Sequence, residues 1–358
     1  MTLTMRYYHH HHFHRYLPVV ALITLCSVVV SAYVYKCEPG TEPTVCRIWN
    51  LHYDEEAAAK HPDRVPTANF SSTVRTVHLL YFRYYFKRHN QLRQYDLTLH
   101  GTVLRNPPNV LIHETRLERL FIPTNLQMGD FTDNIITVIV TDPSQTYDVR
   151  YLDLADNRLS NVANLSALTR LETLNLEANR LRTLDPDMFK RMDNLTHLYL
   201  GDNHFASFDF KTFPKRLQVL WLTRNSLSKL NLAGFILAEL KELDLESNSL
   251  TTLNLASVFT AFPALQTLPI AYNKFGKSEA KLMLAELRRR NVSYFIGMER
   301  DDDLDCDYDE FRVDDLCFTE VSIGDNSFWK GTVLLVVAVL VVAVFLLSVR
   351  WIWYQMRY

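Results

Sequence analysis

The feature of the sequence that most restricts its fold is a spacing of apolar residues that recurs along the middle of the chain. In each copy, apolar side chains occupy the first, fourth, sixth and eleventh positions, and an asparagine occupies the ninth. Successive asparagines are separated by 22, 24, 22, 23 and 25 residues. They are Asn157, Asn179, Asn203, Asn225, Asn248 and Asn273. Six consecutive matches of this depth do not arise by chance, so the chain contains structural repeats.

Each repeat alternates two kinds of side chain over a short strand. In the first copy, Leu152 and Leu154 point to one face, and Tyr151 and Asp153 point to the other. Because no single copy can bury its own leucines, the copies must stack and pair their strands in parallel. The asparagine ends each strand at a turn, where its amide can satisfy backbone groups of its own and the neighbouring copy. This pattern is typical of the leucine-rich repeat and predicts an α/β solenoid, a horseshoe with a parallel concave sheet, over residues 148–295.

The regions on either side of the array are less regular, and we expect them to cap it. Residues 33–147 are predicted to form an N-terminal cap with degenerate repeats; a separate small domain is the alternative. Within them, residues 117–125 resemble a seventh unit, and residues 135–140 resemble a strand that lacks the asparagine. Residues 278–290 have a helical pattern that would close the last repeat. Residues 296–328 are predicted to form the C-terminal cap and an acidic juxtamembrane segment.

Two apolar stretches predict a secretory route and a membrane tether. Residues 1–32 combine a basic leader with an apolar run that ends in small residues, as in a signal peptide; an uncleaved signal anchor is the alternative. Residues 329–349 include 19 consecutive uncharged residues, which would span about 28 Å as a transmembrane helix. Acidic residues precede this run and basic residues follow it. The positive-inside rule therefore predicts a single-pass type I protein of the plasma membrane, with an extracellular repeat domain and residues 350–358 as a cytosolic tail.

Four of the five cysteines form two close pairs, Cys37 with Cys46 and Cys306 with Cys317. Four cysteines allow three connectivities, but in an oxidising compartment we expect two local disulfides, one in each cap. A zinc site is the alternative; the pairs lie about 260 residues apart and contain no Cys-x-x-Cys spacing, so we predict no metal site. The acidic block 301–315 lacks the spacing of an EF-hand and is predicted to be a solvated spacer. Sequons for N-glycosylation occur at Asn69, Asn164, Asn194 and Asn291.

The outward positions of the strands predict a binding surface on the concave face. Tyr199 and Trp221 occupy the same column on adjacent repeats, about 5 Å apart by strand spacing. Exposed aromatic side chains beside acidic residues are typical anchors of protein interfaces; chance exposure on a long solenoid is the alternative. No sequon falls in these columns. The candidate binding residues are Tyr151, Asp153, Asn175, Glu177, His197, Tyr199, Trp221, Thr223, Glu242, Asp244 and Glu246.

Three local sequences resemble the leucine-rich-repeat immune proteins of mosquitoes, in their membrane-anchored form. They are the segment from Cys37 to Cys46, the sequence Asn-Leu-Glu-Ala-Asn-Arg-Leu around Asn179, and Asp303-Leu-Asp-Cys306 directly after the array. The resemblance implies a role in innate immune recognition. Soluble members of that family carry a C-terminal coiled coil, whereas this chain has no heptad run, so assembly through such a coil is not expected here.

Composition and motifs narrow the class of function. The chain has 38 basic and 40 acidic residues and a net charge of −2, which gives no bulk reason to expect a nucleic-acid partner. It contains no phosphate-binding loop, nucleophile elbow, zinc-protease motif or kinase signature, so we predict no catalytic residues, cofactor or small-molecule substrate. We expect a cell-surface protein that binds a protein ligand or co-receptor in innate immune recognition. Cell adhesion or a developmental receptor is the alternative.

Overall fold

The computed structural model places most of the repeat region and its two caps. It describes residues 33–39, 42–81, 92–295 and 306–319. The segments predicted as signal peptide, membrane helix and cytosolic tail lie outside these residues. Within the described part of the chain, no helix is long and apolar enough to cross a membrane.

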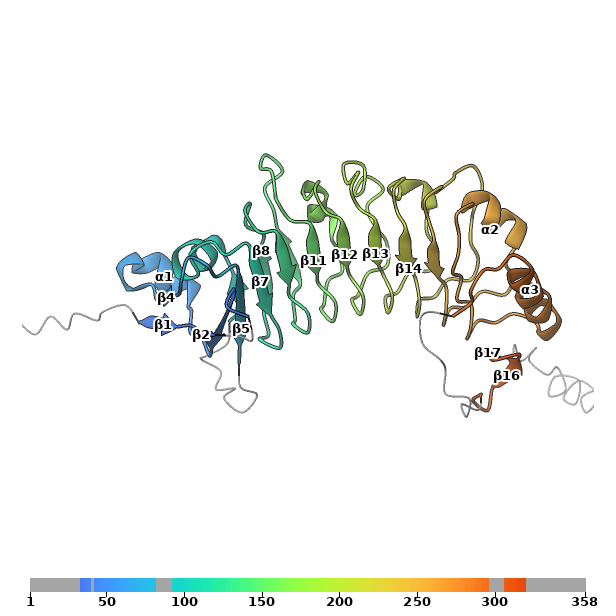
Figure 1. Cartoon of the computed structure of the whole chain (residues 1–358), viewed down its shortest axis with the longest axis horizontal. Coiled ribbons are helices and arrows are strands. Elements are labelled where there is room, and N and C mark those ends of the chain that lie inside the picture. The colour runs from blue at the N-terminus through green and yellow to red at the C-terminus, as the bar shows by residue number, and fades with distance from the viewer. Residues whose placement is uncertain (1–32, 40–41, 82–91, 296–305, 320–358) are drawn as a thin grey trace, which may run out of the picture.

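The molecule is an elongated row of stacked repeats, and one strand from each repeat joins a ten-stranded sheet that runs along the row (Figure 1). Neighbouring strands pair in parallel, except that β2 runs antiparallel to β3 at the N-terminal edge. The strands of this sheet are β2 (Glu38–Pro39), β3 (Val45–Trp49), β5 (Thr76–Leu80), β7 (Asn109–Ile112), β9 (Met128–Asp130), β11 (Tyr151–Asp153), β12 (Thr173–Asn175), β13 (His197–Tyr199), β14 (Val219–Trp221) and β15 (Glu242–Asp244). The predicted solenoid with a parallel sheet is confirmed. We call the sheet face that points away from the leucine core the concave face.

The remaining elements lie outside this sheet. A second, three-stranded parallel sheet has the order β10-β8-β6, β1 pairs in parallel with β4, and β16 pairs antiparallel with β17. These strands are β1 (Val34–Lys36), β4 (Thr67–Asn69), β6 (Gln94–Tyr95), β8 (Arg119–Phe121), β10 (Val138–Val140), β16 (Glu310–Val313) and β17 (Leu316–Thr319). The helices are α1 (Glu55–Lys60), η1 (Pro62–Arg64), η3 (Leu99–Val103), η4 (Ala163–Ala167), η5 (Phe210–Thr212), α2 (Leu255–Ala261) and α3 (Lys277–Arg289).

The asparagine of each repeat ties neighbouring turns together. Asn157 donates from Nδ2 to the carbonyl oxygens of Leu154 and Ala155 in its own repeat and of Phe131 in the preceding one, at 2.9–3.1 Å. Its Oδ1 accepts the backbone N–H of Ile136 at 2.9 Å. The residue before each asparagine has a positive φ, for example 52° at Asp156, which turns the chain and aims the amide inward. One side chain thus satisfies four buried backbone groups that the strand ends would otherwise leave unpaired.

A similar asparagine stands one repeat further upstream, where the sequence pattern is broken. Asn134 donates to the carbonyls of Ile112, Phe131 and Thr132 and accepts the backbone N–H of Leu117. It belongs to the repeat of β9, in which Gly129 occupies the position of the usual leucine. A Cβ at Gly129 would lie 2.6 Å from a ring carbon of Phe131, so the large ring fills the space that the missing side chain leaves.

The prediction that residues 117–125 form a seventh unit of the sheet is therefore wrong. β8 and β10, which lie in residues 117–125 and 135–140, pair with each other in the three-stranded sheet and not in the ten-stranded one. Asn125 donates to the carbonyl of Asn106 and contacts His100, outside the asparagine ladder. The concave strand of this region comes instead from β9. Leucine spacing alone does not reveal which of two neighbouring strands joins the main sheet.

Both ends of the row carry a disulfide, as predicted. Cys37 is bonded to Cys46 beside β2 and β3, and Cys306 is bonded to Cys317 on β17. The C-terminal hairpin continues the stacking, because the carbonyl of Cys317 accepts the N–H of Tyr272 at 2.8 Å. Phe318 is fully buried, and its ring lies 6.1 Å from that of Phe275 in the last repeat. The hairpin therefore covers leucine-core surface that the last repeat would otherwise expose.

Candidate functional site: the concave face

The concave face carries the candidate binding residues in three columns that follow from the strand register. β13 pairs with β14 so that His197 lies opposite Val219 and Tyr199 lies opposite Trp221. β11 and β12 likewise bring Asp153 opposite Asn175. The parallel pairing gives every repeat the same register, so the alternation in the sequence becomes continuous rows of side chains across the sheet.

The aromatic pair lies near the middle of the C-terminal half of this face. The ring centroids of Tyr199 and Trp221 are 4.8 Å apart, and the rings are nearly perpendicular at 82°. The indole Nε1 of Trp221 donates to the Glu242 carboxylate on the next strand. Both rings are half-buried. Edge-to-face packing and the hydrogen bond fix the two rings, which lowers the entropy that a partner would lose on contacting them.

Two of the candidate carboxylates are more buried than the alternation predicts. Asp153 is 8% exposed and Asp244 is 4% exposed. Asp153 accepts the N–H of Ala155 at 3.0 Å, and Asp244 accepts the N–H of Glu246 at 2.8 Å. Each caps its own strand end, as short polar side chains do in turns. These two residues shape the face and its charge, whereas a partner would contact mainly their neighbours.

The Tyr151 hydroxyl and the Asn175 amide both bind the carboxylate of Asp153. Tyr151 donates from its hydroxyl and Asn175 from its amide to Oδ2 of Asp153, at 3.1 and 3.2 Å. Glu177 extends over Gly201, where a Cβ would lie 2.7 Å from Oε1 of the glutamate and 2.8 Å from Cγ2 of Thr223. The absence of a side chain at Gly201 therefore lets the Glu177 carboxylate lie beside the aromatic column.

The carboxylates of this face raise one another's pKa. Burial raises the pKa of Asp244 to about 7, and the charges of Glu246, Glu242 and Glu177 add to this effect. Burial raises the pKa of Glu177 and the nearby aspartate Asp153 raises it further, whereas the charge of Arg224 lowers it. The phenol of Tyr199 also has a raised pKa because it is partly buried and faces Glu242 and Glu177. The region around the aromatic pair is thus a field of negative charge.

Basic side chains of the array are engaged on its flanks and not on this face. Arg150 pairs with Glu172 at 2.7 Å, and Arg224 pairs with Asp202 at 3.0 Å. Arg170 pairs with Asp148. Among the described residues, no Lys or Arg forms an ion pair with Asp153, Glu177, Glu242 or Asp244. The columns from β11 to β15 contain carboxylates and aromatics and no Lys or Arg.

Comparison with known proteins agrees with this architecture. Residues 147–205 and 215–275 match the family model described as Leucine rich repeat. This part of the chain is a leucine-rich-repeat domain. The match contains the aromatic pair and all of the other candidate binding residues.

Curated relatives share the repeats over part of their length. Mimecan of Gallus gallus is 31% identical over 158 residues, which cover 41% of this chain and 52% of mimecan. Toll-like receptor 10 of Bos taurus is 30% identical over 152 residues, which cover 40% of this chain and 19% of the receptor. The chain therefore spans about half of the first relative and a fifth of the second.

Solved structures to which the chain is similar include the leucine-rich-repeat domain of APL1B. That domain is 19% identical to this chain, with a TM-score of 0.46, and the comparison covers 86% of this chain and all of that one.

The four sequons of the chain are exposed and lie off the concave face. Asn69 ends β4, Asn164 lies in η4, Asn194 is in the loop before β13, and Asn291 follows α3. Asn164 also donates to the carbonyl of Ile139 at 2.8 Å. None of these side chains projects among the binding columns, so glycans at these positions would leave the concave face accessible.

The sequence reasoning missed a polar cluster on the N-terminal half of the same face. His113 Nε2 lies 2.9 Å from Oδ1 of Asp130, and the ring of His113 is 5.5 Å from that of His78. The Asp130 carboxylate raises the pKa of His113, whereas burial and the charges of His113 and Arg47 lower the pKa of His78. Asn134 precedes Asn157 by 23 residues, the interval of the other repeats, and this interval could have located the strand that carries Asp130.

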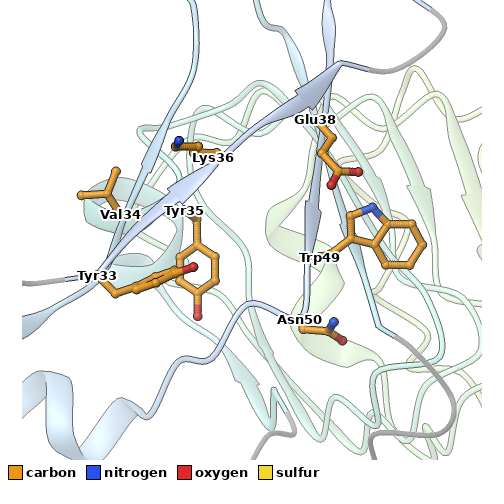
Figure 2. A pocket seen from close by; sticks show the side chains of 7 residues that line it. All are labelled: Tyr33, Val34, Tyr35, Lys36, Glu38, Trp49 and Asn50. Atoms are coloured by element: carbon orange, nitrogen blue, oxygen red, sulfur yellow. The ribbon is translucent and has the colours of Figure 1, made fainter.

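Two other features of the described chain resemble binding sites. Cys306, Glu310 and Cys317 are close enough to share a metal ion, but both sulfurs belong to the disulfide and cannot act as thiolate ligands. An open hollow beside β1 and β3 is shown in Figure 2, where the rings of Tyr33 and Tyr35 lie across from Trp49 and Glu38. It lies at the N-terminal end of the sheet, outside the repeats that contain the aromatic pair.

Proposed function

We propose that this chain is a cell-surface binding protein whose concave face binds a protein ligand or co-receptor in innate immune recognition. The observation that carries the proposal is the fixed pair of Tyr199 and Trp221 on a sheet face that bears no sequon. Half-exposed, pre-ordered aromatic rings are the side chains that most often dominate a protein interface. The relatives, which include a Toll-like receptor, support a binding role for the repeats.

The charge of the face favours a partner that presents Lys or Arg. Glu177, Glu242 and Asp244 lie around the aromatic pair, and among the described residues none of them forms an ion pair with Lys or Arg; the charge of Arg224, which pairs with Asp202, acts on Glu177 and lowers its pKa. A basic side chain entering between them would pair with these carboxylates and could also stack on the Trp221 ring. An acidic partner would instead meet like charge over the whole patch.

The proposal includes anchoring by the segment 329–349, with the repeat domain outside the cell. It is supported by the hydropathy of that segment, by the two disulfides and by the exposed sequons. Protease treatment of intact cells tests it, because an extracellular repeat domain is removed while a tag after Tyr358 remains protected. Protection of the repeat domain would contradict this topology.

The concave site is tested with three forms of the chain displayed on cells: wild type, Trp221→Ala, and Leu282→Ala as a matched control. Leu282 on α3 is 73% exposed and lies away from the concave face, so its loss removes apolar surface elsewhere. Proteins captured by wild type are identified by cross-linking and mass spectrometry, and their affinities are then measured. We expect Trp221→Ala to weaken binding by at least about 2 kcal/mol, roughly thirtyfold in Kd, with almost unchanged thermal stability.

Two results would count against the proposal. A captured partner that binds Trp221→Ala as tightly as wild type, but loses affinity with Leu282→Ala, would move the site off the concave face. A partner that binds better after Glu177→Gln or Glu242→Gln would contradict the preference for basic side chains.

A further inference from the structure

One tyrosine of the C-terminal cap is set apart from the others by its exposure. Tyr308 is 104% exposed relative to an extended chain, so its whole ring and hydroxyl lie in solvent. The next most exposed tyrosines of the described chain are Tyr33 at 67% and Tyr151 at 36%. The Tyr151 hydroxyl donates to Asp153, whereas Tyr308 lies in a surface turn between Cys306 and β16. An enzyme can therefore approach the Tyr308 phenol from all sides.

The turn is held in place at its base. Glu310 donates its N–H to the carbonyl of Asp307 at 3.0 Å, and its carboxylate accepts the N–H of Asp307 at 3.1 Å. The disulfide from Cys306 to Cys317 ties the segment that precedes β16 to β17. The turn that carries Tyr308 is thus held by the disulfide at Cys306 and by the hydrogen bonds between Asp307 and Glu310.

The charge next to Tyr308 is entirely negative. Asp307, Asp309 and Glu310 adjoin it in the sequence. The hairpin contains one basic residue, Arg312, which is turned the other way: it donates to the carbonyl of Asp314 at 3.0 Å and lies 3.8 Å from the Asp315 carboxylate. No basic side chain within the hairpin therefore offsets the acidic residues beside the phenol.

We propose that Tyr308 is a site of tyrosine O-sulfation. Sulfotransferases of the secretory lumen act on phenols that are exposed and surrounded by carboxylates, because a basic enzyme cleft attracts such a segment. The donor is adenosine 3′-phosphate 5′-phosphosulfate. The phenolic oxygen forms a bond to sulfur while the bond from sulfur to the phosphate oxygen breaks. Adenosine 3′,5′-bisphosphate leaves with that electron pair, and an enzyme base takes the phenolic proton.

The product carries a permanent negative charge in the turn that precedes β16. Added to Asp307, Asp309 and Glu310, it makes this turn a compact anionic patch that fits a basic protein surface. This inference shares with the proposed function only the passage of the repeat domain through the secretory lumen. It does not depend on the concave face.

The test uses the full-length chain expressed in animal cells that are fed radioactive sulfate. Trypsin releases residues 301–312 as one peptide, in which Tyr308 is the single tyrosine. After the disulfide is reduced, mass spectrometry under conditions that retain sulfate esters reports the mass of one sulfuryl group on this peptide. We expect the modification in wild type and its loss in Tyr308→Phe. We also expect its loss after chlorate treatment, which blocks synthesis of the donor, and a large decrease when Asp307 and Asp309 are both changed to Asn.

Glycosylation of the same molecules separates the two ways in which the inference can fail. Peptides containing Asn194 or Asn291 report passage through the lumen. A chain that is glycosylated there but unmodified at Tyr308 overturns the sulfation site and leaves the proposed function intact. A chain with neither modification overturns both the lumenal route and the sulfation. A phosphatase-sensitive group on Tyr308 that persists in chlorate would also overturn the sulfation proposal. An unmodified Tyr33 peptide beside a sulfated Tyr308 peptide would support it, because it would show that the acidic neighbours of Tyr308 are required.

Discussion

The two halves of the repeat array reach the same backbone geometry with different side chains. In the C-terminal half, from β11 to β15, leucines fill the core and the asparagine ladder is regular. In the N-terminal half, from β3 to β9, the leucine pattern is lost, and Gly129 with Phe131 replaces two leucines. The left-handed residue and the asparagine nevertheless recur, at Asp133 and Asn134. The turn and its amide therefore define the repeat more strictly than the leucines do.

The halves also differ in how their concave carboxylates are compensated. Asp130, in the N-terminal half, has His113 at 2.9 Å. Asp244, in the C-terminal half, has Glu242 and Glu246 as its charged neighbours, and burial raises its pKa to about 7. In the N-terminal half the carboxylate pairs with a histidine, whereas in the C-terminal half the carboxylates lie next to one another and beside half-buried aromatic rings. A protein surface of the second kind is less stable alone and better suited to a charged partner.

The largest expected effect tests whether the two halves share the ladder. Asn134→Ala and Asn179→Ala each leave carbonyl and N–H groups without partners in a buried turn. We expect each substitution to lower the free energy of unfolding by on the order of 3–5 kcal/mol. Chemical denaturation of the purified repeat protein measures this. Asn125→Ala is the matched control, because Asn125 lies outside the ladder. If Asn134→Ala cost no more than Asn125→Ala, the two halves would not be held by the same device.

The next effect concerns the uncompensated charge at Asp244. Between the ordinary pKa of 3.8 and the native value of about 7, the native chain keeps a proton that the unfolded chain has released. The free energy of unfolding therefore falls as the pH rises through this window. Asp244→Asn keeps the acceptor for Glu246 N–H and removes the charge, so it should abolish a pH-dependent loss on the order of 3 kcal/mol between about pH 4 and pH 8.

Thermal unfolding at several pH values measures this difference. Asp63→Asn, at an exposed position in η1, is the control and should leave the pH profile of wild type unchanged. A profile for Asp244→Asn that parallels wild type would mean that the carboxylates of the C-terminal half are compensated after all.

A smaller effect tests whether Phe131 compensates for the missing leucine at Gly129 in the N-terminal half. Gly129→Leu restores the consensus but places a side chain where the Phe131 ring lies, since even a Cβ would be 2.6 Å from it. We expect a loss of about 2 kcal/mol from overpacking. The double variant Gly129→Leu with Phe131→Leu should recover most of it, because the pair then matches the other repeats. Denaturation of the single and double variants compares them directly. Equal instability of both would show that Phe131 does not compensate for the glycine.

Sequence reasoning reached most of the fold because the strongest constraints are local and periodic. The asparagines, the alternation of apolar and polar residues and the paired cysteines can all be recognised in the sequence. The structure also places Tyr199 beside Trp221, as the strand register predicts. Sequence reasoning failed where one residue compensates for another. Gly129 stands in place of a consensus leucine, so the pattern does not detect its repeat, whereas Leu120 and Ile122 match the consensus although β8 lies outside the main sheet. The sequence pattern also did not predict the burial of Asp153 and Asp244. The alternation gives the sheet face toward which a side chain points, but the hydrogen bond to the backbone N–H that the carboxylate caps determines how deeply the carboxylate is buried.

The smallest effect concerns the compensated carboxylate of the N-terminal half. The contact with Asp130 raises the pKa of His113, so this pair adds stability at acidic pH and loses it as the pH rises through the raised value. His113→Gln should therefore lower the free energy of unfolding by less than about 1 kcal/mol at about pH 5.5, because both groups are partly exposed, and should hardly change it at about pH 8. The melting temperature at the two pH values measures this difference. His61→Gln, on the exposed N-terminal cap, provides the comparison. The effects of His113→Gln and Asp244→Asn should be additive in the double variant, because Asp130 and Asp244 are far apart along the array and share no partner. Strong coupling between them would mean that the concave face titrates as one unit, and the contrast between its two halves would then disappear.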